Sequence, residues 1–222
     1  MHISHIPDWA IKRGKYINHF TRLDPSTTAV VNVDMQNIFM APGNIYPNPH
    51  AMDIVPAVNT LSDAFRQAGA RIIWTRQTYS HAPGLTMPAW QYDRTDPTVI
   101  AAIAALEAGT EAQSIHPAMH VRPEDLQIDK YRYSAFLCPD DKLKPALHER
   151  GVDTLVITGT LTNCCCESTA RDGNLLGFKV FFVSDATATV TDEEHNAALL
   201  NLRLNFADVR TTKEMLELLA PS

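Results

Sequence analysis

The sequence predicts an α/β protein in which six strands form a mostly parallel sheet with helices on both faces. Short apolar, β-branched runs alternate with segments whose apolar residues recur at helical spacing. Such alternation is typical of consecutive β-α-β units, whose right-handed crossovers give a parallel sheet. Because the 222 residues contain no Gly/Ser-rich or Pro-rich linker, we expect a single domain over residues 1–222.

The first part of the chain supplies two strands and the helix between them. Residues 1–27 show no clear period, and we expect an N-terminal arm packed over the domain or over a partner subunit. The apolar run at 28–33 predicts a buried strand, and the run at 71–75 predicts the next one. Between them, residues 53–68 place apolar side chains on one helical face and end at Gly69.

Two irregular segments interrupt this pattern. Residues 35–43 lead from the first strand into a loop with proline and glycine breakers. Residues 76–96 form the longest irregular stretch and are dense in aromatic side chains. Loops of that length are often lids or binding loops, which favours a role in substrate binding over a plain surface excursion.

The remainder of the chain continues the alternation of strands and helices. We expect, in order, a helix at 97–107, a loop at 115–121, a strand at 125–129, a helix at 142–150, a strand at 154–157, a helix at 167–176, a strand at 179–183, a helix at 193–205, a strand at 207–209 and a helix at 212–219. Thr211 or Thr212 is expected to cap the last helix.

Composition favours a small-molecule ligand over a macromolecular partner. The formal net charge of -6 disfavours nucleic acid or an anionic membrane as the main partner. The N-terminus lacks an apolar signal segment, and no run approaches the roughly 18 apolar residues of a membrane helix. Four cysteines, three of them contiguous, make a poor disulfide framework, so we expect reduced thiols and a cytoplasmic location.

Three consecutive cysteines, Cys164, Cys165 and Cys166, stand where a predicted strand turns into a predicted helix. The backbone N–H groups and the helix dipole at such a turn lower thiol pKa values and favour anions. Successive helical residues lie about 100° apart around the axis, so at most one thiol should point into a site at the strand ends. Spacing does not choose among the three, and all of them could instead be small buried apolar residues.

An acid and an amine accompany the thiols at predicted strand ends. Asp34 follows the first strand and Lys130 follows the third. Ligands of open α/β sheets bind outside the carboxyl ends of the strands. A carboxylate, an ammonium and a thiol can form an activated nucleophile, with the carboxylate as proton acceptor. Singly, such an Asp is more typical of a turn and such a Lys of a solvated surface, so only their joint placement favours a site.

Four segments together resemble the isochorismatase-like cysteine hydrolase superfamily. They are VDMQN at 33–37, KYRYSAF at 130–136, GTLTNCCCESTARDG at 159–173 and VSDA at 183–186. The resemblance spans about 28–208 and is nearest to ureidoacrylate amidohydrolases and other enzymes that cleave ureido or carbamoyl groups. It implies a Rossmann-like three-layer α/β/α fold and a homo-oligomer, either a dimer or a tetramer.

The superfamily's catalytic triad maps onto Asp34, Lys130 and Cys165. By this resemblance, Asp34 accepts the thiol proton, Lys130 stabilises the charged pair and the Cys165 thiolate attacks a carbonyl carbon. The backbone N–H groups of Leu161 and Cys165 would bind the oxyanion. Asp34 would then activate the water that hydrolyses the thioester, and no cofactor is needed. A non-proline cis peptide of the superfamily maps onto Thr160–Leu161.

Six side chains are expected to contact the substrate. One of them, Trp74, could equally be a strand residue of the core. The six are Gln36, Asn37, Trp74, Tyr79, Trp90 and Tyr133.

No catalytic metal is expected. Nicotinamidases of the superfamily bind a metal through an Asp-x-His motif, whereas Asp53 is followed by Ile54 and Val55. Several histidines are therefore interpreted as surface or loop residues, namely His50, His81, His116 and His120.

The leading functional hypothesis is a cysteine-dependent amidohydrolase that cleaves a C–N bond of a small amide, ureido or carbamoyl substrate through a thioester. A second hypothesis is an isochorismatase-type hydrolase of a vinyl ether, in which Asp34 acts as general acid and no thiol is required. The cysteine at the nucleophile position argues against it. A third is a nucleotide-binding module or inactive scaffold, but residues 35–37 offer no glycine-rich turn for a pyrophosphate.

Overall fold

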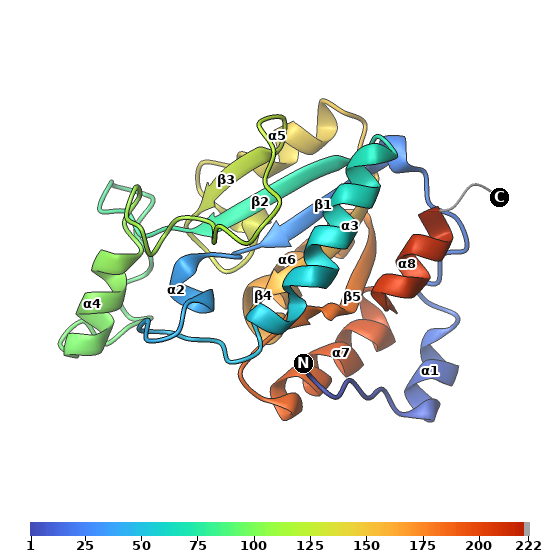
Figure 1. Ribbon diagram of the computed structural model, residues 1–222, viewed down its shortest axis with the longest axis horizontal. Coiled ribbons are helices and arrows are strands. Elements are labelled where there is room, and N and C mark those ends of the chain that lie inside the picture. The colour runs from blue at the N-terminus through green and yellow to red at the C-terminus, as the bar shows by residue number, and fades with distance from the viewer. Residues whose placement is uncertain (220–222) are drawn as a thin grey trace.

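The structure, a computed structural model, describes residues 1–219 and contains one six-stranded sheet (Figure 1). Every neighbouring pair of strands is parallel, in the order β3-β2-β1-β4-β5-β6. The strands are β1 (Thr28–Val33), β2 (Arg71–Gln77), β3 (Leu126–Lys130), β4 (Thr154–Thr160), β5 (Lys179–Ala188) and β6 (Asp208–Arg210). The predicted α/β fold class is confirmed, with a sheet that is parallel throughout.

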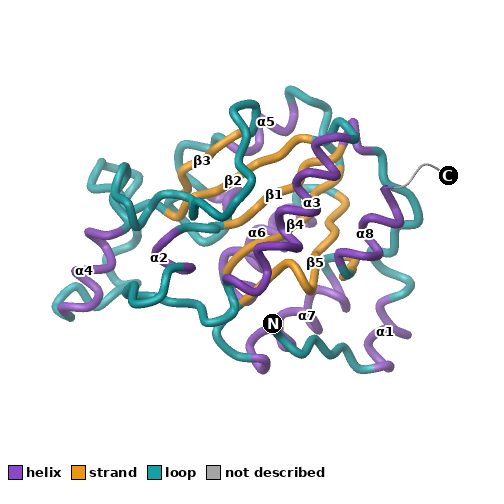
Figure 2. The backbone as a smooth tube through the Cα atoms, in the orientation of Figure 1, coloured by secondary structure: helices purple, strands orange, loops and turns teal. Residues whose placement is uncertain are grey.

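Helices cover both faces of the sheet, which gives three layers (Figures 1 and 2). On one face α3 and α8 contribute side chains such as Phe65 and Met215 to the core, and on the other α5, α6 and α7 contribute side chains such as Leu143, Ala170 and Leu199. The helices are α1 (Asp8–Gly14), α2 (Asn37–Met40), α3 (Val55–Gln67), α4 (Pro97–Ala105), α5 (Leu143–His148), α6 (Glu167–Leu175), α7 (Asp192–Asn205) and α8 (Thr212–Leu219).

The strand order reverses between β1 and β4, which are neighbours in the middle of the sheet. The chain runs from β1 outwards to β2 and β3, and from β4 outwards to β5 and β6. At such a switch point the connections leave on opposite faces, so a crevice opens at the carboxyl ends of the two central strands. Asp34 follows β1 and the three cysteines follow β4, which places both at this crevice.

Several strands run beyond their predicted ends. The interior positions Asn32 and Thr158 pair in register, and the Thr158 hydroxyl donates to Oδ1 of Asn32 at 2.6 Å. Polar residues are tolerated inside the sheet because they bond one another. Gly159 has a φ of 108°, and a Cβ there would overlap the backbone of Val33. The sequence pattern missed Thr158 and Gly159 because the prediction for that strand relied on its apolar run alone.

The N-terminal arm and the first loop contain short helices that were not predicted. Residues 8–14 of the arm form α1, which packs along α7 of the same chain with Ala10 fully buried. Residues 37–40 of the expected loop form the single turn α2. Thr211 caps α8, since its hydroxyl accepts from the N–H of Glu214 at 3.3 Å. Among residues 1–219, no helix has the length and apolar character that crossing a bilayer would require.

Candidate active site

A cavity of about 470 Å³ opens beside the carboxyl ends of β2 and β4. Its walls come from the segment after α2, from the irregular stretch before α4 and from the turn after β4. The residues that line it are Phe39, Ile45, Tyr46, Pro47, Asn48, Gln77, Tyr92, Leu106, Tyr133, Thr160, Leu161, Cys164, Cys165 and Val190.

The turn after β4 places two of the three cysteines at this cavity. A cis peptide joins Thr160 and Leu161, as expected, and a wide π-type turn covers 162–166 before α6 begins. The N–H groups of Cys164 and Cys166 both donate to the carbonyl of Leu161 at 3.2 Å. Turns of this width are rare and often occur at functional sites.

The expectation that at most one thiol points into the site is wrong. Cys165 lines the cavity although only 7% of its surface is exposed, and the half-buried Cys164 lines it as well. Cys166 is fully buried in the core, where its Sγ lies 3.7 Å from the carbonyl oxygen of Thr158. The prediction assumed ordinary α-helical angles, and the wider turn changes the angular spacing of successive side chains.

Lys130, the last residue of β3, connects the thiol to the acid. Its fully buried ammonium lies 2.7 Å from Oδ2 of Asp34 and donates to Sγ of Cys165 at 3.2 Å. It also donates to Oε1 of Gln77 at 2.6 Å and to the carbonyl of Arg132 at 3.1 Å. The three residues that the sequence placed at strand ends thus meet at the edge of the sheet.

Asp34 is held rigidly at the end of β1. It is fully buried and has a φ of 50°, a left-handed conformation that is uncommon for a residue with a side chain. The hydroxyl of Thr75 donates to Oδ1 at 2.8 Å, and the Asp34 N–H donates to the carbonyl of Thr75 at 3.2 Å. Within the described chain, Oδ2 has only the ammonium of Lys130 as a partner. A lone pair on Oδ2 is therefore available to accept a proton.

The electrostatics of the site favour a charged ammonium. Burial by itself would lower the pKa of Lys130, but the carboxylate of Asp34 and the sulfur of Cys165 outweigh it and raise that pKa. A hydrogen bond between the two cavity thiols lowers the pKa of Cys164 and raises that of Cys165. Burial raises both pKa values, but it does not outweigh the hydrogen bond at Cys164, whose pKa is lowered overall. Lys130 opposes burial at both sulfurs and favours the thiolate form.

Two of the six expected substrate contacts face a cavity, and one more lies in solvent. Tyr133 lines the cavity and its hydroxyl lies 3.0 Å from that of Tyr92. Tyr79 lines a separate hollow of about 50 Å³ next to it. Trp90 is 84% exposed and lies outside the cavity wall.

The other three expected contacts serve the fold instead of the cavity. Trp74 is fully buried under α3, because side chains alternate along β2 and its ring points to that layer. Gln36 is also fully buried, and its amide bonds the backbone of Gln77 and Gln113. Asn37 donates to the carbonyl of Glu111 at 2.8 Å. None of these three residues lines the cavity.

Several lining residues were missed by the sequence reasoning. Gln77 could have been predicted because ligands bind at the carboxyl ends of parallel strands, but this strand was predicted to end at Thr75. Tyr92 lies in the aromatic stretch that was interpreted as a binding loop, and it reaches the cavity where Trp90 does not. Tyr46 and Asn48 carry no signal in the sequence, since a proline-rich loop gives no periodicity from which to predict direction.

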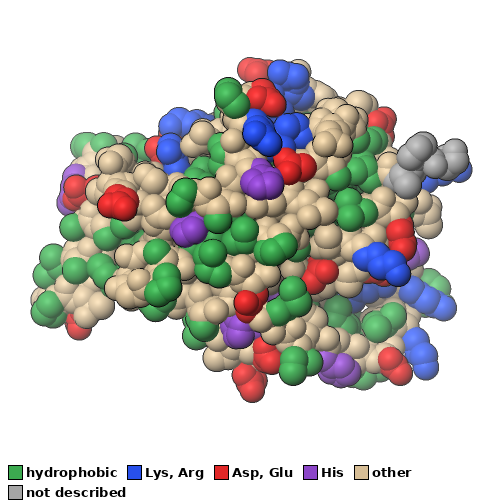
Figure 3. Space-filling view, in the orientation of Figure 1, with side chains coloured by type: hydrophobic (Ala, Val, Ile, Leu, Met, Phe, Trp, Pro, Cys, Tyr) green, Lys and Arg blue, Asp and Glu red, His purple; other side chains and the backbone are tan. Residues whose placement is uncertain are grey.

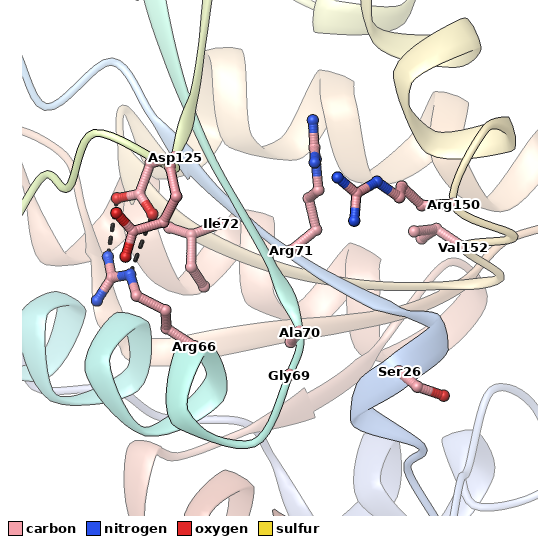
Figure 4. A pocket seen from close by; sticks show the side chains of 10 residues that line it. Ser26, Arg66, Gly69, Ala70, Arg71, Ile72, Asp125, Arg150 and Val152 are labelled. Atoms are coloured by element: carbon pink, nitrogen blue, oxygen red, sulfur yellow. Dashed lines mark hydrogen bonds and ion pairs between the residues drawn. The ribbon is translucent and has the colours of Figure 1, made fainter.

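A second cavity, of about 520 Å³, lies at the amino ends of the strands (Figure 4). Arg71 and Arg150 point into it, and Arg66 pairs there with Asp125 at 2.8 Å. Lys and Arg side chains gather on this part of the surface around α5, with acidic groups among them (Figure 3). This cavity contains no thiol and lies at the sheet edge opposite Cys165, so we place the chemistry at the first one.

One group of side chains offers ligand atoms of a type that metals bind. His2, His50 and Asp192 place one such atom each within 4.8 Å of one another. However, Nδ1 of His2 lies 2.7 Å from Oδ1 of Asp192, and its Nε2 accepts from the N–H of Thr189 at 3.0 Å. Both ring nitrogens of His2 are thereby used in hydrogen bonds. The group fits a hydrogen-bonded attachment of the N-terminal arm better than a metal centre.

Comparison with known proteins adds a family match. The family described as "Isochorismatase domain" matches residues 28–214. Nicotinamidase 3 of Arabidopsis thaliana is 33% identical over 187 residues, covering 83% of this chain and 85% of that protein. Ureidoacrylate amidohydrolase RutB of Caulobacter segnis is 31% identical over 207 residues, covering 86% and 85%.

A solved structure also matches closely. A cysteine hydrolase from Pseudomonas syringae pv. phaseolicola superimposes with a TM-score of 0.78 at 28% identity. The match covers 89% of this chain and 94% of that one. The family match over residues 28–214 includes all six strands and the turn that bears the cysteines.

Proposed function

The chain belongs to the isochorismatase domain family, and on that premise we propose that it is a cysteine-dependent amidohydrolase. The proposed substrate is a small amide, ureido or carbamoyl compound, whose C–N bond is cleaved through a thioester. The observation that carries this proposal is the position of the Lys130 ammonium, which contacts both Asp34 and Cys165 at the cavity floor.

The first step is the activation of the thiol. Asp34 accepts the proton of Cys165 on Oδ2, whose only described partner is Lys130. We assign the resulting negative charge to Cys165 and not to Cys164, because the ammonium touches the sulfur of Cys165 at 3.2 Å. A buried cation at that distance stabilises a thiolate strongly, since little water screens it.

The second step is the attack on the carbonyl carbon. The thiolate adds to the carbonyl, and the N–H groups of Leu161 and Cys165 bind the oxyanion that forms. Both residues line the cavity, directly after β4 and within the wide turn. Asp34 returns its proton to the departing nitrogen, which leaves as ammonia or an amine. It then takes a proton from water, which attacks the thioester and releases the acid.

The relatives support C–N cleavage over vinyl ether hydrolysis. Two of them are named as a nicotinamidase and an ureidoacrylate amidohydrolase. Vinyl ether hydrolysis needs no thiol, whereas Cys165 lines the cavity. The contact between Lys130 and Cys165 would also have no role in that reaction.

Ammonia release from a panel of carboxamides and ureides tests the proposal. We expect Cys165→Ala to lose activity by about 10³-fold or more, because the ammonium of Lys130 contacts the sulfur of Cys165. Cys166→Ala is the matched control, since that thiol is buried in the core and should leave kcat nearly unchanged. Turnover by Cys165→Ala at the wild-type rate would refute the proposal.

A further inference from the structure

The cavity wall above the proposed nucleophile carries no ionised side chain among the described residues. Aliphatic and aromatic groups make up most of it, with Phe39 and Ile45 on one side and Leu106 and Val190 among the others. The remaining lining residues are Leu161, uncharged polar groups, tyrosines, a proline and the two thiols. A wall of this kind gives a hydrophobic ligand a favourable place and offers an ionised ligand no partner.

The two ionised groups beneath the cavity, Asp34 and Lys130, pair with each other. Asp34 and Lys130 form a buried ion pair at 2.7 Å, and the ammonium also donates to Gln77 and to the sulfur. Lys130 is therefore surrounded by acceptors of its own chain. A carboxylate on the substrate would have to compete with Asp34 for it, at the cost of the proposed proton acceptor.

The arginines near the cavity donate hydrogen bonds to backbone carbonyls of the chain. Arg132 donates to the carbonyl of Tyr131 at 2.7 Å and contacts the loop at Leu85, and it does not line this cavity. Arg94 donates to the carbonyl of Met87 at 3.2 Å and lies over the ring of Tyr79. Within residues 1–219, no cation is thus placed to pair with a negative group in the cavity.

Two tyrosines of the cavity wall, Tyr46 and Tyr92, stay neutral. Burial, followed by the hydrogen bond with Tyr133, raises the pKa of Tyr92. Burial, followed by the negative charge of Asp96, raises the pKa of Tyr46. Their hydroxyls can therefore donate to a neutral polar atom, and the acid near Tyr46 adds repulsion toward an anion. Gln77 accepts from Lys130 through Oε1, which leaves its amide N–H groups as further donors.

From this wall we infer a substrate class, namely amides or ureides whose remaining part is uncharged, hydrophobic and about the size of one substituted ring. The reacting group in this inference rests on the proposed function. The volume of about 470 Å³ lies within the range of pockets that enclose such molecules. Substrates that carry a carboxylate beyond the scissile group are disfavoured, because burial would leave that charge unpaired.

A matched pair of ligands tests the inference independently of turnover. 4-Methylbenzamide and 4-carbamoylbenzoate have the same ring and amide, and a neutral methyl group stands in place of the larger, charged carboxylate. We expect Cys165→Ala to bind the methyl compound about 100-fold more tightly in NMR titrations. Equal or tighter binding of the carboxylate, or no binding of the methyl compound, would overturn the inference. The ureides 4-tolylurea and 4-ureidobenzoate form a second pair with the same expectation.

A charge added to the wall should reverse part of this preference. Val190 lines the cavity and is 46% exposed, so Val190→Arg can place a guanidinium at the rim. In the Cys165→Ala background, we expect that change to strengthen binding of the carboxylate by about three- to fivefold, which is the effect of one partly exposed ion pair. Leu175→Arg adds the same charge at a 74% exposed position outside the cavity and should leave both affinities unchanged. A gain in Leu175→Arg equal to that in Val190→Arg would contradict the inference.

Turnover separates the inference from the proposed function. If the methyl compounds bind with the expected preference but the wild-type enzyme releases no ammonia from them, the amidohydrolase proposal fails and the cavity preference stands. If the wild-type enzyme instead hydrolyses the carboxylate compounds faster, and Cys165→Ala does not, the amidohydrolase proposal stands and the substrate class is wrong.

Discussion

The Nζ atom of Lys130 lies 3.2 Å from the Sγ atom of Cys165. Lys130 belongs to β3 and Cys165 to the turn after β4, two strands that β2 and β1 separate in the sheet, and 35 positions separate the two residues in the chain. The same ammonium lies 2.7 Å from Asp34, so a single buried cation links acid and thiol. The predictions below follow from this contact and from the residues that hold it.

Removal of the ammonium should destabilise the fold as well as abolish activity. Lys130→Met leaves the buried carboxylate of Asp34 unpaired, and we expect the free energy of unfolding to fall by about 3–5 kcal/mol. A second change, Asp34→Leu, should restore most of that stability without restoring activity. Urea unfolding of both variants measures the effect.

An exposed lysine provides the control for this pair. Lys213, whose side chain is 86% exposed, forms only a surface contact with Glu217, and Lys213→Met should change stability by less than about 0.5 kcal/mol. A Lys130→Met variant as stable as Lys213→Met would show that the buried pair does not matter for the fold.

Alkylation should distinguish the cavity thiols from the core thiols. Cys164 is half-buried with a lowered pKa, so we expect iodoacetamide to modify it at least as fast as Cys165. Burial raises the pKa of Cys138 and Cys166, and both should resist modification until the protein unfolds. Peptide mapping over time gives the four rates. Modification of native Cys166 as fast as Cys164 would be inconsistent with the described turn.

Stability should fall in weak acid because of His195. Burial, together with the neighbouring His2, lowers the pKa of His195 to about 4, whereas its unfolded value is 6.5. Between these two pH values the unfolded chain binds more protons, so folding becomes less favourable as the pH falls from 6.5 toward 4. Complete titration corresponds to about 3 kcal/mol. Asp192 opposes the shift and is included in that value.

Unfolding of His195→Gln as a function of pH isolates this contribution. The variant should lack the part of the acid destabilisation that the histidine causes, so its free energy of unfolding depends less on pH between 6.5 and 4. His81, whose side chain is 72% exposed, serves as control, and His81→Gln should retain the wild-type slope. The same slope in all three proteins would rule out the role of His195.

The close approach of β4 to β1 should make Gly159 intolerant of a side chain. A Cβ at this position would overlap the backbone of Val33, which precedes Asp34. We expect Gly159→Ala to cost about 3 kcal/mol or more and to reduce kcat. At Gly177, with a similar φ of 95° and open space around it, alanine should cost only about 1–2 kcal/mol. Equal losses in the two variants would contradict the packing described.

The sequence placed the residues of the proposed triad better than it placed the residues that line the cavity. Asp34 and Lys130 could be placed because a parallel sheet brings all carboxyl ends of its strands to one edge, whatever the loops do. Tyr46 and Tyr92 could not be placed, because irregular segments carry no periodicity from which to predict direction. Trp74 was ambiguous because aromatic residues are common both in strand cores and in binding sites.

Other expectations depend on features that a single folded chain does not contain. A homo-oligomer stays a prediction, and solution scattering or analytical ultracentrifugation would measure it. The choice of Cys165 among three cysteines came from family resemblance, because adjacent cysteines look alike in a sequence. The contact with Lys130 now gives a physical reason for that choice.

The central claim is that Cys165 forms a thioester during turnover, and rapid quenching in acid followed by fragmentation mass spectrometry tests it most directly. The peptide that contains Cys164, Cys165 and Cys166 should carry the acyl mass of the substrate on Cys165 while turnover proceeds. An adduct located on Cys164, or steady turnover with no adduct and no loss of rate in Cys165→Ala, would contradict it.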